Sequence, residues 1–176
     1  MGRLMMVATA LVLATALLAG CKKPVPAGAS GYSYKDLDDY MALDMPAGWE
    51  RRDKVDDAKV VFLSPPAAGP AQVEIRVRVL PKVTSDLNEY LGMIKAASQS
   101  REGAKEIQAK VAQHKNGKEG CLTEYEYTEM GTLMHVKQWA ILANGKQYVV
   151  TATVPGMALQ QLMPQVDKIL DSLIIW

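Results

Sequence analysis

The sequence is poor in the residues that most often carry catalysis, redox chemistry or metal binding. Its 176 residues include only two cysteines and two histidines. Neither His114 nor His135 has a Cys, His, Asp or Glu neighbour at the spacing typical of a metal site. There is no G-x-S-x-G motif, phosphate-binding loop or paired metal-binding motif. We therefore expect no enzyme activity, no cofactor and no metal.

An excess of charge of one sign is also absent. The chain has 20 Lys and Arg against 19 Asp and Glu, with no long run of like charge. A protein that binds nucleic acid needs a basic surface against the phosphates, so nucleic acid is not an expected partner. Hydrophobic residues make up 49% of the chain, and no repeat of fixed period is visible. This composition is typical of one globular domain.

The long hydrophobic run of the chain lies at its N-terminus. Arg3 is followed by an uncharged apolar stretch, residues 4–18. This is the layout of a secretory signal peptide. The string Leu17-Leu18-Ala19-Gly20-Cys21 resembles the lipobox of bacterial lipoproteins. The resemblance implies that residues 1–20 are removed and that Cys21 carries fatty chains such as palmitate, which attach the chain to a membrane.

Two other interpretations of this segment stay open: an uncleaved transmembrane anchor, and a signal peptide cut elsewhere that releases a soluble periplasmic protein. The lipobox is favoured because consecutive residues match it and the cysteine stands in the required place. Lys22 follows this cysteine. An aspartate there tends to hold enterobacterial lipoproteins in the inner membrane, so the outer membrane is favoured. Residues 21–33 are expected to be the lipidated Cys21 and a flexible tether, and residues 34–176 the domain.

Beyond the tether, the sequence predicts mostly β-strands. Residues 71–80 alternate apolar and polar side chains, which indicates a strand with one buried face. Asn116-Gly117 and Asn144-Gly145 are strong hairpin signals, so we expect a mostly antiparallel sheet. The other expected strands are 40–45, 59–63, 107–113, 121–127, 133–143 and 147–154.

Two helices are expected to cover this sheet. The first begins at Ser85 or Asp86 and ends near Arg101, and the second spans about 158–173. Pro164 is expected to divide the second helix into a short first turn and a main helix. Antiparallel strands with apolar-striped helices predict an α+β layered domain.

Five local strings occur in a characteristic order. They are Pro46-Ala47-Gly48-Trp49, Val61-Phe62-Leu63-Ser64-Pro65, Ser85–Tyr90, Gly145–Pro155 and Ile169–Leu173. In this order they resemble the PsbP-like superfamily, which includes bacterial lipoproteins of the DcrB type. The resemblance spans about residues 38–174 and implies an α-β-α sandwich around a mostly antiparallel sheet flanked by two main helices. Members serve as binding or assembly factors and many have no known role, so the resemblance implies little about activity.

Most of the conspicuous side chains are expected to be structural. Trp49 should pack at the sheet edge and Trp139 in the core. His114, next to the Asn116-Gly117 turn, should be a solvated hairpin residue. Cys121 has no cysteine partner once Cys21 is lipidated, and it should be buried and inert.

Met130, Met134 and His135 lie close together in the sequence, and thioether and imidazole ligands suit Cu(I). Their spacing matches no compact motif, so methionines that only fill the core remain the favoured interpretation.

The sequence thus predicts a lipid-anchored, non-enzymatic binding or assembly module that faces the periplasm and meets an envelope protein partner. The alternative is a carrier of a small ligand or lipid, with a pocket between sheet and helix. An enzyme that uses Cys121 or a histidine is the third and least favoured hypothesis.

Overall fold

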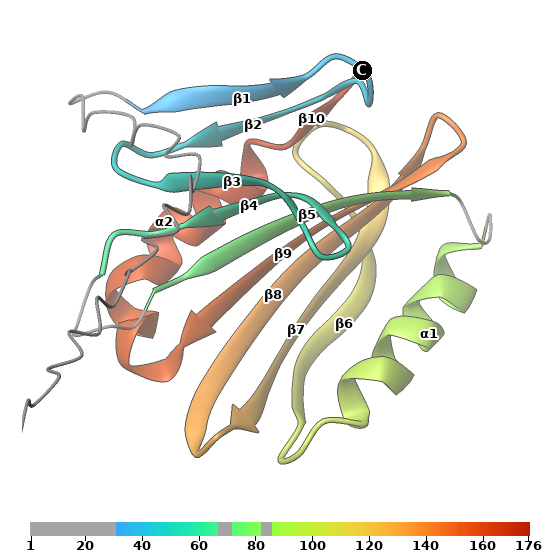
Figure 1. Ribbon diagram of the computed structural model, residues 1–176. Helices are drawn as coiled ribbons and strands as arrows, with labels where there is room; N and C mark the ends of the chain where they lie inside the picture. Colours follow the sequence, from blue (N-terminus) through green and yellow to red (C-terminus); the bar gives the residue numbers. More distant parts are fainter. Residues whose placement is uncertain (1–30, 67–71, 82–85) are drawn as a thin grey trace, which may run out of the picture.

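The computed structural model describes residues 31–66, 72–81 and 86–176 (Figure 1). Cys21, with the signal segment and most of the expected tether, lies outside these residues, as does Ser85. In chain order the elements are β1 (Tyr32–Asp36), β2 (Met41–Met45), β3 (Glu50–Val55), β4 (Ala58–Leu63), β5 (Glu74–Pro81), α1 (Leu87–Gln99), β6 (Lys105–Gln113), β7 (Glu119–Glu129), β8 (Thr132–Ala143), β9 (Lys146–Pro155), the 3-10 turn η1 (Gly156–Ala158), α2 (Leu159–Asp171) and β10 (Ile174–Ile175).

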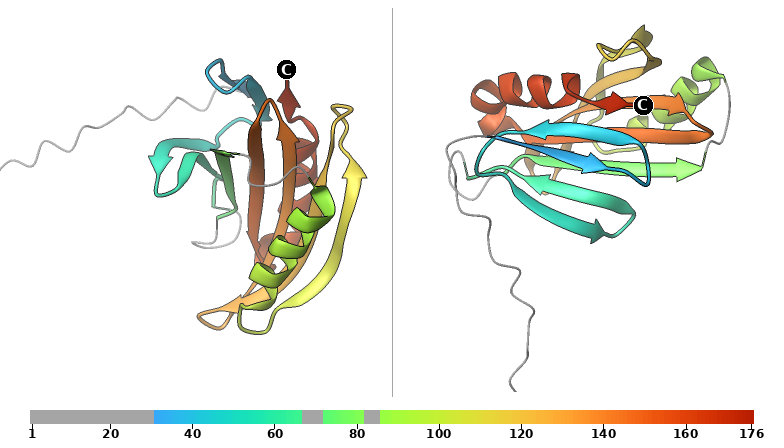
Figure 2. Two further views of the ribbon diagram at one scale, coloured as in Figure 1. Left: turned by 90° about the vertical axis from the view of Figure 1, so that its right-hand side faces the viewer. Right: turned by 90° about the horizontal axis from the view of Figure 1, so that it is seen from above.

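The described strands form two sheets. The larger has seven strands in the order β3-β4-β5-β9-β8-β7-β6, and every neighbouring pair is antiparallel. Its strands twist progressively from β3 to β6 (Figure 2). The smaller sheet has the order β1-β2-β10. Between β8 and β9, Asn144 and Gly145 have φ values of 52° and 70°, the positive angles that a two-residue hairpin turn needs, which confirms that hairpin prediction.

The main core lies on one face of the large sheet, beneath α2 and the small sheet. Val166 and Leu170 of α2 are buried there with Trp139 and Val150 of the sheet and with Leu43 of β2. Burial of this many apolar side chains is the main source of the free energy of folding.

The opposite face of the large sheet carries α1. Tyr90 of α1 packs on Cys121, Ala140 and Val149 in a separate, smaller cluster. Ala140 directly follows the core residue Trp139, and consecutive residues of a strand point to opposite faces. The two helices therefore cover opposite faces, and the expected α-β-α arrangement is confirmed.

Asp86 is the N-cap of α1. Its Oδ1 accepts hydrogen bonds from the backbone N–H groups of Asn88, at 2.8 Å, and Glu89, at 3.4 Å. These bonds satisfy two of the N–H groups that a helix start leaves without intrahelical partners.

The structure corrects the expected elements in several places. The strands β1, β3 and β10 were not expected. The helix α2 runs without a break through Pro164, so the expected division there is wrong. Pro164 lacks an N–H group and deprives the carbonyl of Gln160 of its helical donor, but the buried stripe of α2 holds the helix together.

Candidate ligand-binding groove

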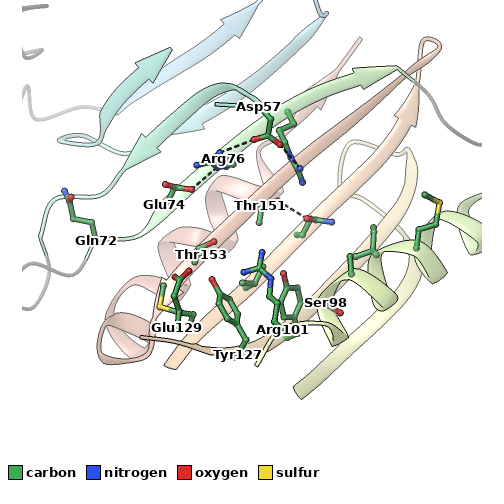
Figure 3. Close-up of a pocket in the computed structure, with 18 of the residues that line it drawn as sticks. Asp57, Gln72, Glu74, Arg76, Ser98, Arg101, Tyr127, Glu129, Thr151 and Thr153 are labelled. Carbon is green, nitrogen blue, oxygen red and sulfur yellow. Dashed lines mark hydrogen bonds and ion pairs between the residues drawn. The ribbon is translucent and has the colours of Figure 1, made fainter. Parts of the chain in front are cut away.

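The helix α1 covers only part of its face of the large sheet. It packs mainly along β6 and β7, and Tyr90 also covers Ala140 and Val149. The rest of this face on β5, β9 and β8 is left open beside the helix. The result is a groove of about 800 Å³ between the sheet and α1 (Figure 3). A pocket between sheet and helix, which the carrier hypothesis requires, is therefore present.

The polar side of the period-two strand β5 forms one wall of the groove. Arg76 binds Glu74 through Nε, at 3.0 Å, and Asp57 through Nη1, at 3.1 Å (Figure 3). Arg78 binds the other oxygen of Asp57 through Nη1, at 3.1 Å. The Nε group of Arg78 is buried and has no hydrogen-bond partner among the described residues. Two acidic groups thus fix the orientation of both arginines and leave one buried donor unused.

The floor of the groove is a row of polar side chains on β8 and β9. The hydroxyl of Thr151 donates to Oε1 of Gln138, at 2.9 Å. Gln138 is only 8% exposed, yet within the described part of the chain its amide Nε2 has no hydrogen-bond acceptor. This amide nitrogen is not among the buried side-chain atoms that lack a partner, so it faces the open groove, where a water molecule or a ligand can accept its hydrogen bond.

The facing wall comes from β7 and the end of α1. The guanidinium of Arg101 lies 4.5 Å from the ring centre of Tyr127, and the rings of Tyr125 and Tyr127 are 6.2 Å apart. Burial raises the pKa of Tyr125, and the positive charges of Arg101 and Arg78 oppose that rise. The charges of both arginines therefore lower the pKa of the same phenol group, that of Tyr125, although the two side chains come from opposite walls of the groove.

His114 is not the solvated hairpin residue that the sequence predicts. It is 2% exposed, its Nδ1 accepts from the N–H of Asn116 at 3.1 Å, and its Nε2 lies 2.9 Å from the carbonyl of Leu170. Its ring meets that of Trp139 edge-on at 4.9 Å. The end of α2 packs over this hairpin, a long-range contact that residues 114–117 alone do not reveal.

His135 lies on the α2 face, away from the groove, in a small acidic cluster. Its Nε2 is 2.8 Å from Glu124 Oε1, and its Nδ1 is 3.5 Å from Glu126 Oε1. The hydrogen bond from His135 lowers the pKa of Glu124 to about 2 against the opposing effect of burial. The same bond raises the pKa of His135. Among the described residues no group of Cys, His, Asp or Glu side chains has the geometry of a metal site.

The Cu(I) alternative also lacks the required geometry. Met134 lines the groove, His135 points to the opposite face, and Met130 is fully exposed in the turn between β7 and β8. The sequence neighbours Met134 and His135 are separated because a strand alternates its side chains between two faces.

Cys121 is fully buried, as expected, under α1. Its Sγ contacts the carbonyl of Leu87 at 3.2 Å, and burial raises its pKa to about 11. Trp49 and Trp139 are also buried, in the main core. Cys121 thus has none of the features of an activated thiol.

The arrangement of two helices on a large antiparallel sheet is an α+β fold of the PsbP-like type. The structure is similar to cyanobacterial PsbP of Synechocystis sp. PCC 6803, with a TM-score of 0.62 and 18% identity over 89% of this chain and 99% of that chain.

Two further solved structures share the fold. LpqN of Mycobacterium tuberculosis, a protein involved in cell envelope biogenesis, has a TM-score of 0.62 and 17% identity over 87% of this chain and 89% of its own. PA94 of Pseudomonas aeruginosa has a TM-score of 0.58 and 17% identity over 84% and 98%. None of the three is named as an enzyme. At these identities the likeness shows the fold alone.

No protein-family model and no curated protein sequence matches the chain. Within the described residues, no helix has both the length and the apolar composition needed to cross a membrane.

Proposed function

We propose that the chain is a non-enzymatic, lipid-anchored module of the bacterial cell envelope that faces the periplasm and binds a small polar ligand in the groove beside α1. The observation that carries the proposal is the groove itself. Its volume of about 800 Å³ lies within the usual range of ligand sites, roughly 300–1,000 Å³. The similarity to LpqN, a protein named for cell envelope biogenesis, supports the envelope location.

The lining argues for a polar ligand over a fatty chain. An acyl chain on the floor would leave the Gln138 amide and the Arg78 Nε group unpaired and out of water. An unpaired buried polar group costs about 1–3 kcal/mol. The small-ligand form of the carrier hypothesis is therefore favoured over the lipid form.

Native mass spectrometry tests this function directly. The full chain, purified from its own host under mild conditions, is expected to carry a bound small molecule that denaturation releases. Recovery of an empty protein in every preparation would contradict the proposal.

The lipid anchor is tested by Cys21→Ser. The substitution is expected to release the chain from membranes or to block its processing, because serine offers no thiol for the diacylglycerol. Membrane attachment that survives removal of residues 1–20 would show that the lipobox interpretation is wrong.

A protein-docking role, as an assembly module, is the second candidate, and an exposed apolar tip favours it. The turn after β1 and the end of the chain expose Leu37 (73%), Tyr40 (51%) and Trp176 (48%), and the backbone N–H of Trp176 donates to the carbonyl of Tyr40 at 3.1 Å. A pull-down from native membranes is expected to enrich one partner in stoichiometric amount, and Tyr40→Ser with Trp176→Ser should abolish that enrichment.

A further inference from the structure

Several hydrogen-bond donors of the groove are without a partner among the described residues. Gln138 contributes an amide N–H₂ group and Arg78 a buried Nε–H group, and both are without acceptors in the described part of the chain. The Tyr125 hydroxyl also has no partner among these residues. A ligand that satisfies them must present acceptors, and it must do so at several points at once.

The charged side chains of the groove differ in whether they already form an ion pair. Asp57 and Glu74 are bound to Arg76 and Arg78, so their negative charge is already compensated. The guanidinium of Arg101 lies over the Tyr127 ring and has no carboxylate partner among the described residues. A guanidinium without a carboxylate is the group best suited to bind a carboxylate or a phosphate.

The remaining acidic group, Glu129, lies at the end of the groove beside Tyr127 (Figure 3). Burial raises the pKa of Tyr127, and the charges of Arg101 and Glu129 act on that pKa in opposite directions. The charged groups that act on the neighbouring Tyr125 are the two cations Arg101 and Arg78. The region around the Tyr125 hydroxyl is therefore the positive part of the groove.

We propose that the groove binds the negatively charged group of a small organic ligand, a carboxylate or a phosphate, and that Arg101, Arg78 and Gln138 hold this group. The half-buried side chain of Ile94 and the buried side chain of Val136 form the apolar part of the lining that faces the rest of the ligand. This inference rests on the proposed ligand-binding function and adds the chemical class of the ligand.

Calorimetric titration of the detergent-purified full chain tests the inference with named probes. Inorganic phosphate and glutarate are expected to bind with a single site and with an affinity that falls as salt rises, whereas glucose, a neutral polyol, is expected not to bind. Binding of glucose without binding of either anion would overturn the inference and leave the ligand-binding function standing. An empty protein by native mass spectrometry would instead contradict the function itself.

Arg101→Gln is the decisive variant, because Arg101 is exposed and its loss should not disturb folding. It is expected to weaken anion binding about ten-fold or more, which corresponds to the loss of one charged hydrogen bond. Lys110→Gln, on β6 and outside the groove, removes the same charge and is expected to leave the affinity within about two-fold of the original. Equal weakening in both variants would show that the anions bind only through the general charge of the chain.

A last comparison identifies the source of the anionic group. Dihexanoyl phosphatidylglycerol and sn-glycerol 3-phosphate share the phosphate, and only the first has fatty chains. Binding of both with similar affinity indicates a soluble metabolite, and preference for the first indicates a lipid headgroup. Failure of both, together with failure of glutarate, would overturn the inference.

Discussion

At the scale of single residues, His135 forms its hydrogen bond to Glu124 largely out of contact with water. Their side chains are 6% and 14% exposed, so solvent screens the pair only weakly. Glu124 also accepts a hydrogen bond from Gln108 Nε2, at 2.6 Å. The pair therefore contributes to stability in a way that depends on the protonation of both partners.

The two pKa shifts set the pH window of this contribution. The raised pKa of His135 means that its stabilisation is complete below its unfolded pKa of 6.5 and is lost as the pH rises through the folded pKa. The lowered pKa of Glu124 means that its stabilisation is complete above 4.5 and is lost as the pH falls towards about 2. The pair is strongest between these two values.

We expect Glu124→Gln to lower the free energy of unfolding by about 2 kcal/mol near pH 5.5, and by less near pH 8.5, because the contribution of His135 is lost as the pH rises through its raised folded pKa. Urea denaturation at the two pH values measures the difference. Glu119→Gln, at the exposed start of the same strand, is the matched control and should change neither value by more than about 0.5 kcal/mol. An equal loss at both pH values would contradict the assigned coupling.

Cys121 allows a second test with one residue. Because the thiol is buried under α1 and its pKa is raised, we expect alkylation of the folded chain to be far slower than alkylation of the denatured chain. Mass spectrometry after treatment with iodoacetamide, with and without urea, measures the two rates. Comparable rates in the folded and denatured chain would show that Cys121 is accessible and would revive a role for its thiol.

Single residues also show where sequence reasoning is sufficient. The burial of Cys121 and Trp139 follows from the alternation along their own strands. His114 is different, because its partners Leu170 and Trp139 come from distant parts of the chain. From the sequence alone, a polar residue beside a turn is predicted to be exposed to solvent. Only the packing of another element over it, which the local sequence does not show, reverses that prediction.

At the scale of elements, the cap of α1 matters beyond the helix, because α1 forms a wall of the groove. We expect Asp86→Ala to cost about 1 kcal/mol, since two N–H groups lose their acceptor, and Asp86→Asn to cost much less. Hydrogen exchange should show the loss of protection in α1 and not in α2. Equal loss in both helices would show that α1 does not open on its own.

The strands differ in how readily their sequences reveal them. β5 shows apolar and polar side chains in strict alternation, and β8 and β9 are joined by Asn144-Gly145. β3 reads Glu-Arg-Arg-Asp-Lys-Val and has no apolar face to recognise, because it lies at the sheet edge and is exposed along most of its length. Charged side chains on an edge strand hinder pairing with other chains, which explains its composition.

The sequence predicts part of the lining of the groove and not the groove itself. Its polar lining is visible as the wet side of β5, with Glu74, Arg76 and Arg78, and as Thr151 and Thr153 on β9. The sequence does not contain the position of α1, which packs mainly on β6 and β7 and reaches β8 and β9 through Tyr90. That position depends on the twist of the whole sheet and on packing between elements far apart in the chain.

At the scale of the whole molecule, the last strand, β10, pairs with β2 and so joins the C-terminal residues to the first part of the chain that the structure describes. Ile175 of β10 is 4% exposed and belongs to the main core, whereas its neighbour Ile174 is 52% exposed. We expect Ile175→Ala to lower the free energy of unfolding by about 3 kcal/mol. Ile174→Ala is the matched control, with an expected change below about 0.5 kcal/mol. Urea denaturation measures both, and similar values for the two would show that β10 does not pack as described.

The arrangement of the small sheet also has a mechanical consequence. β1 and β10 both run antiparallel to the strand β2 that separates them, so they are parallel to each other. Tension applied between the start of β1 and Trp176 acts along the strands, across the hydrogen bonds that join them. These bonds must then break together in shear, and not one after another as in an unzipping hairpin. A domain held by its N-terminal segment and pulled at its C-terminus would resist that force with its smallest sheet.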